Sequence, residues 1–376
     1  MSVGVFNQYK VFFNLASLQD FIDEEAIDHF TVIEVAGGDL PQFELVFSYD
    51  KTDILPYLNE GNKLIVSYED EGGKTFDVNL SITESELDNQ GSDGKVYTIR
   101  GLFAATGYYL DHHVYITKKQ PSMFTMSEIA GKHFSFDTNR PPPNDKQYWV
   151  QHGITDQRFL NNVWLHTDFT DSFPLVGITA KGQYRYYDAK KMPEPSIEFG
   201  YDESADYELE QQYKIRTGTG LLNIWGAYNI QQHQTSLYDA GSFSSTVTTN
   251  PVKNIFTGAS TLHRASSAPA NFELPVHWMP DNVHPNYWEC YRRNLTSLLS
   301  YSTHQAVVRC TKKYVDVNIL DTIIFKDNMP YKKSAVEDYS GTYIVTMVSR
   351  VLAKRGMTTT LTFSREAVNT QEGALR

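Results

Sequence analysis

Apolar and polar side chains alternate with a period of two between Phe30 and Arg100, and this pattern limits the fold more than any other feature of the chain. Successive side chains on a strand point to opposite faces, so the alternation predicts strands that bury one face. The apolar series are Phe43, Leu45, Phe47 and Tyr49, then Leu64, Val66 and Tyr68, then Val78, Leu80 and Ile82, with a further short strand from Val96 to Arg100. Glycine-rich turns separate them at 37–39, 72–73 and 91–94. Residues 1–106 therefore predict a small, mostly antiparallel tube-like β-barrel, with one short early helix from Ser17 to Ile27.

The pattern loosens over residues 107–206, which predict a mixed α+β connecting domain. Residues 154–170 form an amphipathic helix in this interpretation, because Phe159, Leu160, Val163 and Trp164 fall on one face. Pro174 ends it, and residues 175–178 and 184–187 predict a hairpin around Lys181-Gly182.

A second β region follows, and we predict a second tube-like barrel from residues 207–232 together with 300–366. Its expected strands are 213–217, 221–230, 306–310, 315–317, 322–325, 343–350 and 358–363. The intervening residues 233–299 predict a polar, exposed insertion and a helix that Asn286 would cap, both assigned to the connecting region. Residues 367–376 form a C-terminal tail.

The two β regions share one local pattern. Residues 59–63 lead into Leu64-Ile65-Val66, and residues 317–321 lead into Thr322-Ile323-Ile324-Phe325. This raises the possibility of a duplicated module. The predicted fold class is thus mainly β with α+β: two small antiparallel tube-like barrels joined by a mixed α+β region.

Composition excludes several classes of protein. The chain has 33 Lys+Arg against 45 Asp+Glu, a formal charge of -12, which argues against a general nucleic-acid binder because phosphate neutralisation needs clustered basic residues. No apolar run predicts a signal peptide or a membrane span. The two cysteines, Cys290 and Cys310, predict free thiols in a reducing compartment. Aromatic residues make up 13% of the chain, which favours half-buried sheet surfaces and interfaces.

Sequence motifs for catalysis are absent, and we assign no catalytic, cofactor-binding or metal-binding residue. Asp111-His112-His113 is the most plausible metal candidate, but adjacent histidines on a strand point to opposite faces, so we expect a surface segment. A second candidate, His263, His277 and His284 near Asp281, is expected to make ordinary hydrogen bonds. Cys290 and Cys310 have no metal-ligand spacing with histidines.

The chain also contains residue types suited to two further chemistries, glycoside hydrolysis and sugar binding. Carboxylate pairs at Glu24-Glu25, Glu203 with Asp206, and Glu208 with Glu210 are expected in turns or on solvent faces rather than in a glycosidase cleft. Tryptophan side chains could stack on sugars, but core or interface positions are favoured for Trp149, Trp164, Trp225, Trp278 and Trp288.

The order of elements resembles the baseplate hub proteins of contractile-tailed bacteriophages, the late control D family, and the hub part of type VI secretion spike proteins. The resemblance rests on the opening barrel with residues 43–47 and 63–68, the middle segment 159–164, and a closing segment. In that closing segment a helix ending at Leu298-Leu299 leads into strands at 306–310, 319–325, 343–348 and 359–363.

The resemblance implies a homotrimeric structural protein of the virion that is not an enzyme and needs no cofactor. Three chains with two barrels each would form a pseudo-six-fold ring. The ring would join the hexameric tail tube above to the trimeric central spike below and form part of the DNA ejection channel. Other baseplate proteins would bind at the periphery, and assembly would take place in the cytoplasm of the bacterial host. DNA would pass without specific binding, which acidic or neutral side chains facing the channel would favour.

Two alternatives remain open at this point. A carbohydrate- or receptor-binding β protein of a virion would need a row of exposed aromatic side chains. A polysaccharide hydrolase would need two carboxylates facing each other across a cleft.

Overall fold

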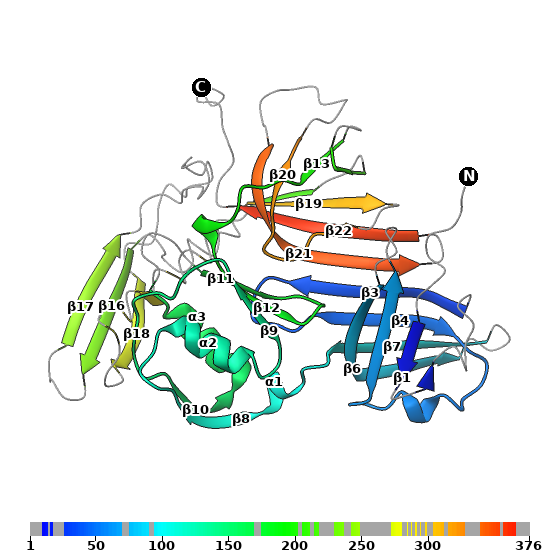
Figure 1. The fold of residues 1–376 in the computed structure, drawn as a ribbon, viewed down its shortest axis with the longest axis horizontal. Helices are drawn as coiled ribbons and strands as arrows, with labels where there is room; N and C mark the ends of the chain where they lie inside the picture. Colours follow the sequence, from blue (N-terminus) through cyan, green and yellow to red (C-terminus); the bar gives the residue numbers. More distant parts are fainter. Residues whose placement is uncertain are drawn as a thin grey trace.

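The structure is a computed structural model, and its fold is mainly β with a few short helices (Figure 1). It describes residues 10–13, 16–17, 26–69, 75–89, 94–168, 174–201, 205–210, 214–217, 229–236, 242–248, 272–279, 304–311, 315–327, 339–353 and 356–365, and the single residues His284, Tyr287, Cys290, Tyr291, Asn294 and Leu298. No helix within these ranges is long and apolar enough to cross a membrane.

The first half of a 14-stranded sheet is one antiparallel unit. It comprises β3 (Ile27–Val35), β4 (Gln42–Ser48), β5 (Lys63–Glu69), β6 (Thr75–Asn89) and β7 (Lys95–Phe103), in the spatial order β3-β4-β7-β6-β5. A 3₁₀ turn, η3 (Leu55–Tyr57), precedes β5, and β1 (Lys10–Phe13) and β2 (Ala16–Ser17) extend the sheet beyond β5. The alternating residues of β4, Phe43, Leu45 and Phe47, lie in its core as the sequence predicts.

The second half repeats this arrangement. It comprises β15 (Lys214–Thr217), β19 (His304–Thr311), β20 (Thr322–Phe325), β21 (Gly341–Ala353) and β22 (Gly356–Arg365), in the order β15-β19-β22-β21-β20, again with every pair antiparallel. Two short parallel strands, β13 (Glu198–Gly200) and β14 (Tyr207–Glu208), extend it beyond β20. Strands β3, β4, β5, β6 and β7 thus correspond in chain order and in pairing to β15, β19, β20, β21 and β22.

The turn that enters β5 and β20 has the same backbone geometry in both units. Gly61 and Leu320 both have positive φ, 83° and 69°. Their N–H groups donate to the carbonyls of Ile82 and Val345, both at 2.8 Å. A leucine in this left-handed conformation is unfavourable, and here its side chain is fully buried. The local pattern noted in the sequence therefore reflects a structural repeat.

A bulge sits at the same place in β6 and β21. The registers shift between Ile82 and Glu84 and between Val345 and Met347, which leaves one threonine in each bulge. The hydroxyl of Thr83 donates to the Arg100 carbonyl at 3.3 Å, and that of Thr346 donates to the Thr362 carbonyl at 3.2 Å.

Next to each bulge, one core pair joins a large and a small residue, and the strand that carries the large residue differs between the two units. Phe43 lies opposite Gly101 on β7, whereas Ala306 lies opposite Phe363 on β22. A Cβ atom at Gly101 would lie 2.2 Å from the Phe43 ring, so glycine is required where the partner is large. Each unit keeps one aromatic ring at this pair.

The two units join edge to edge where β3 pairs with the second part of β21, from Met347 opposite Val35 to Ala353 opposite His29. An antiparallel path of eight strands results, β15-β19-β22-β21-β3-β4-β7-β6. The strand pairs of the described residues do not close either unit into a barrel.

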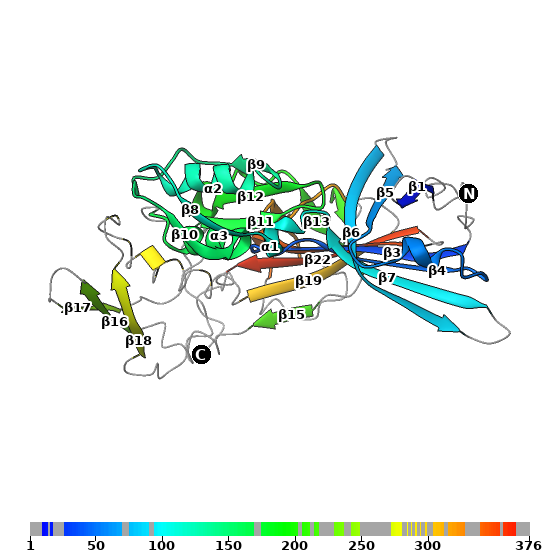
Figure 2. The same ribbon diagram turned by 90° about the horizontal axis from the view of Figure 1, so that it is seen from below.

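The α+β region packs beside this sheet (Figures 1 and 2). It contains α1 (Gly107–Leu110), β8 (His112–Ile116), α2 (Ser122–Ala130), β9 (Ser135–Thr138), β10 (Val150–Thr155), α3 (Asp156–Leu165), β11 (Pro174–Ile178), β12 (Gln183–Asp188) and the 3₁₀ turn η5 (Ala189–Lys191). Helix α3 buries Phe159, Leu160, Val163 and Trp164, and β11 and β12 form the predicted hairpin. Tyr287, Tyr291 and Leu298, from the helical residues near 287–298, pack on the same core.

Three sequence predictions were wrong in part. Residues 315–317 form no strand, because Val315 and Val317 fill the core while their carbonyls accept hydrogen bonds from Arg350. The early helix predicted from Ser17 to Ile27 does not form at either end, because Ser17 lies in β2 and Ile27 begins β3. Residues 18–25 between them lie outside the described ranges. The strand expected at 221–230 does not join the second unit in its described part, because residues 229–230 begin β16 (Asn229–Ser236), which forms a separate three-stranded sheet with β17 (Ser242–Thr248) and β18 (Phe272–Met279). Residues 218–228, Asn286 and the tail 367–376 lie outside the described ranges.

Candidate functional site

The junction between the two β units contains a buried ion pair. Arg350 Nη1 on β21 lies 2.7 Å from Glu34 Oε2 on β3, and the two side chains are 5% and 1% exposed. Arg350 Nη2 also donates to the carbonyl of Val317, and Glu34 Oε1 accepts the backbone N–H of Ala180, both at 2.5 Å. One pair of charges thus holds together both β units, the 315–317 loop and the α+β region.

Equivalent hollows lie beside the two bulges. The first, about 310 Å³, contains Ile33, Gln42, Thr83, Glu84 and Arg100 in its lining. The second, about 370 Å³, contains Arg216, Gln305, Thr346, Met347 and Thr362, which occupy the same positions in the repeat. Trp164, Leu175 and Leu298 of the α+β region complete the second hollow and make it largely apolar.

The hollow in the first unit is charged. Arg100 Nε lies 2.8 Å from Glu44, and Arg100 Nη1 lies 3.3 Å from Glu84 and 3.5 Å from Glu86. The Arg100 hydrogen bond lowers the pKa of Glu44, although partial burial opposes that shift. A glycosidase acid needs a raised pKa, so Glu44 has the wrong electrostatics for that role.

The predicted histidine candidates are dispersed. His112 Nδ1 lies 2.8 Å from the Gly153 carbonyl, whereas His113 Nε2 lies 4.0 Å from the buried carboxylate of Asp156. Asp156 is held by His133 Nε2 at 2.8 Å and by Gln151 Nε2 at 2.9 Å. The described residues therefore bring His113 to a structural carboxylate network rather than to Asp111. His263 and Asp281 lie outside the described ranges, as does the side chain of His277.

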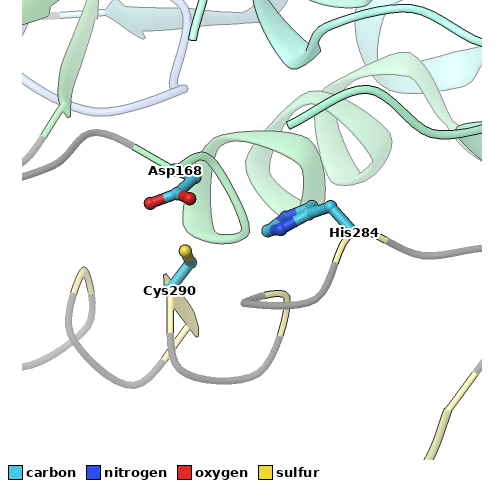
Figure 3. Close-up of side chains that lie close together, drawn as sticks. All are labelled: Asp168, His284 and Cys290. Carbon is cyan, nitrogen blue, oxygen red and sulfur yellow. The ribbon is translucent and has the colours of Figure 1, made fainter. Parts of the chain in front are cut away.

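His284 lies in a cluster that sequence spacing did not reveal. Its ring, the Asp168 carboxylate and the Cys290 thiol have ligand atoms within 4.8 Å of one another (Figure 3). His284 and Cys290 are buried and Asp168 is half-buried. Asp168 follows α3, more than a hundred residues before the other two, so only tertiary folding joins them. Among the described residues, these three side chains form the group whose ligand atoms are placed to hold a metal ion.

The two tryptophan side chains that the structure describes lie in the core rather than on a sugar-binding surface. Trp149 and Trp164 are 2% and 7% exposed, and the indole N–H of Trp164 donates to the Pro174 carbonyl. The side chains of Trp225, Trp278 and Trp288 lie outside the described set. Of the carboxylate pairs, Asp206 accepts the Glu198 N–H, Glu208 is exposed and Glu210 lies 3.7 Å from Arg309, while 24–25 and Glu203 are outside that set.

Comparison of the whole chain finds solved structures with a similar fold. No family model and no curated protein matches it. A tail protein from Neisseria meningitidis matches with a TM-score of 0.60 and 9% identity, over 96% of this chain and 97% of that one. The 43 kDa tail protein of prophage MuSo2 from Shewanella oneidensis matches with a TM-score of 0.60 and 10% identity, over 95% and 98%.

A third similar structure comes from a secretion system. An Escherichia coli component of the type VI secretion system, itself described as similar to the T4 bacteriophage tail proteins gp27 and gp5, matches with a TM-score of 0.51 and 10% identity. The match covers 93% of this chain and 77% of that one. The chain therefore has the β-rich fold of phage tail proteins and of this secretion-system component.

Proposed function

We propose that the protein is the structural baseplate hub of a contractile phage tail, a homotrimeric symmetry adaptor located in the virion. It joins the hexameric tail tube above to the trimeric central spike below, and its ring forms part of the DNA ejection channel. Its role is mechanical rather than enzymatic.

The repeated five-stranded unit is the observation that carries this proposal. One chain supplies two topologically equivalent units, so three chains supply six positions around an axis. Six positions match a hexameric tube, while three chains match a trimeric spike. The similarity in fold to phage tail proteins supports the same assignment.

Each unit, in this proposal, forms a tube-like barrel within residues 1–106 or within 207–232 plus 300–366. The α+β region 107–206 packs outside the ring, and the insertion within 233–299 binds other baseplate proteins. The neighbouring subunits cover the strand edges that a single chain leaves unpaired.

The face of the eight-strand path that turns away from both cores is the proposed channel wall. Its placed charges are Lys214, Arg216, Arg309 and Arg100 against Glu44, Asp77, Glu84, Glu86 and Asp88, one more acid than base. DNA binding without sequence preference requires an excess of basic side chains, so a wall without such an excess lets DNA pass without adhering.

Oligomeric mass in solution tests the proposal. The full chain, alone and co-expressed with its cognate spike protein, is measured by light scattering after size exclusion. A species of three 42.9 kDa chains is expected. A strict monomer under both conditions would rule the hub out.

A further inference from the structure

Two strand edges of the eight-strand path have no strand beside them among the described residues. Residues 84–89 of β6 pair with β7 on one side, and β15 pairs with β19 on one side. Glu84, Ser85, Glu86 and Leu87 are all exposed. Such edges are normally blunted, covered or paired with another chain.

The internal junction between the two units provides a pairing pattern that can be compared with the open edge of β6. β21 is the counterpart of β6, and its corresponding segment pairs with β3, the counterpart of β15. The pairs at that junction are Ser349 with Ile33, Arg350 with Val32, and Val351 with Thr31.

Each junction residue has a counterpart at the open edges. Glu86, Leu87 and Asp88 follow the bulge residue Thr83 at the same spacing as Ser349, Arg350 and Val351 follow Thr346. On the other strand, Ile215 lies opposite Ala306 as Val32 lies opposite Phe43. Lys214, Ile215 and Arg216 are therefore the counterparts of Thr31, Val32 and Ile33.

We propose that β6 of one subunit pairs antiparallel with β15 of the next copy of this chain, placing Glu86 opposite Arg216, Leu87 opposite Ile215 and Asp88 opposite Lys214. This inference rests on the proposed ring, and it names the surfaces that close it.

The edge of β6 and the edge of β15 carry opposite charges, although the two edges do not contact each other within one chain. Arg100 already faces three carboxylates, Glu44, Glu84 and Glu86, so the β6 edge has an excess of negative charge. Lys214 and Arg216 are exposed and bring two positive charges. Directly opposite residues of an antiparallel pair share a face, so each acid meets a base.

The apolar residues fall on the other face. Leu87 is 38% exposed, and Ile215 packs against the core of the second unit. Pairing them would cover Leu87 and continue that core across the subunit boundary, as Val32 and the Arg350 stem do at the internal junction.

Charge reversal tests the pairing on the full chain. Glu86→Lys or Arg216→Glu alone is expected to weaken trimerisation by roughly ten-fold or more, since an attractive cross-strand pair becomes repulsive at every seam. The double variant Glu86→Lys/Arg216→Glu restores it. Glu194→Lys, the same charge change at an exposed residue outside the strands, is the matched control and leaves trimerisation unchanged.

Cross-linking gives a second readout that does not depend on affinity. Opposite residues on antiparallel strands have Cα atoms about 4.5–5.5 Å apart, within the range of a disulfide. Glu86→Cys/Arg216→Cys is expected to form covalent dimers and trimers on oxidation, and Glu86→Cys alone should give far fewer. Both native cysteines are buried.

The outcomes separate this inference from the hub proposal. If the wild-type chain trimerises but the reversed and cysteine variants behave like wild type, the seam is elsewhere and the hub proposal stands. If no trimer forms with or without the spike, both are overturned.

A different observation supports a second proposal at the cluster of Asp168, His284 and Cys290. His284 Nε2 lies 3.0 Å from the His166 carbonyl, so Nε2 carries the proton and donates. Nδ1 is left with a lone pair, and this buried atom has no hydrogen-bond partner among the described residues. A ring nitrogen whose opposite N–H is held by a carbonyl is the usual arrangement of a metal-ligating histidine.

We infer that the cluster binds Zn²⁺ through His284 Nδ1, the Cys290 thiolate and the Asp168 carboxylate, with water in the fourth position. Thiolate, imidazole and carboxylate together suit zinc. The cluster lies just past the C-terminal end of α3, which has no basic residue in its last turn, and a cation is favourable there. The ion would tie His284 and Cys290 to Asp168, which follows α3.

Cobalt substitution tests the site. Co²⁺ added to the metal-free full chain is expected to give a sulfur-to-cobalt charge-transfer band that Cys290→Ala abolishes and the control Cys310→Ala retains. His284→Gln is expected to weaken binding by roughly ten-fold or more. No band in the wild type, or an unchanged band in Cys290→Ala with the fold intact by circular dichroism, would reject the site.

Discussion

Replacement of Arg350 by methionine is the sharpest test of how the two β units are held together. The methionine retains most of the apolar stem but removes the guanidinium from a site where Glu34 is 1% exposed. The Glu34 carboxylate still accepts the hydrogen bond from the Ala180 N–H, while the Val317 carbonyl loses the hydrogen bond from the Arg350 guanidinium. Removal of one partner of a buried ion pair costs about 3–5 kcal/mol, because the remaining charge stays out of water.

The double variant separates the ion pair from packing. Glu34→Gln/Arg350→Met buries no uncompensated charge, and the glutamine oxygen can still accept the Ala180 N–H. We therefore expect it to be more stable than Arg350→Met by about 2 kcal/mol or more. The coupling energy of the double-mutant cycle measures the interaction itself.

The assay is denaturant unfolding followed by circular dichroism, with Arg309→Met as the matched control. Arg309 is 54% exposed and lies 3.7 Å from Glu210, so its loss should cost no more than about 1 kcal/mol. The reasoning is refuted if Arg350→Met is as mild as Arg309→Met, or if the double variant costs the sum of the two single variants.

Three further predictions follow from individual residues. Burial raises the pKa of the Asp145 carboxyl group, although hydrogen bonds from the backbone N–H groups of Ser122 and Asp168 oppose this shift. Between the ordinary pKa of an aspartate and this raised pKa, the folded chain holds a proton that the unfolded chain releases. The free energy of unfolding therefore falls as the pH rises through that range. Asp145→Asn should flatten that slope in a pH series of denaturant midpoints, and an unchanged slope would contradict the assignment. Burial raises the pKa of Cys310 to about 12, so its thiol should resist iodoacetamide at neutral pH until the protein unfolds; mass spectrometry showing rapid native labelling would count against this. Gly101→Ala should lower stability by about 1–3 kcal/mol, because the new Cβ meets Phe43 and the Ser81 carbonyl at 2.2 Å; a thermal melt unchanged from wild type would show that the strands can separate there.

Much of the local structure could be predicted from side-chain periodicity. The strands of the first unit and the buried face of α3 follow directly from it, because burial of one face imposes a period of two or of 3.6. The same reasoning failed for Val315 and Val317, whose alternate burial occurs in a loop that serves Arg350. Periodicity reports which side chains are buried but not where the backbone hydrogen bonds go.

The candidate sites were beyond such reasoning for a different reason. Asp168, His284 and Cys290 have no motif spacing, since the approach of His284 and Cys290 to the end of α3 brings them together. His112 and His113 are adjacent in sequence, and their side chains meet different partners, as the alternation of a strand predicts. Spacing along the chain therefore argued correctly against one candidate but could not find the other.

The sequence by itself determined the β-rich class, the hairpin with strands at 175–178 and 184–187, the presence of a helix within 154–170, which the structure places at 156–165, and one trace of duplication. These features depend on local alternation and turn chemistry. Only the tertiary structure decided that the duplication is complete, with matching bulges at Thr83 and Thr346 and matching left-handed residues at Gly61 and Leu320. The physical reason is that pairing register and edge position arise from contacts between segments hundreds of residues apart. Those contacts leave residues 84–89 of β6 and strand β15 as open edges at opposite ends of the eight-strand path, and the proposed pairing with a second copy of the chain uses these two edges.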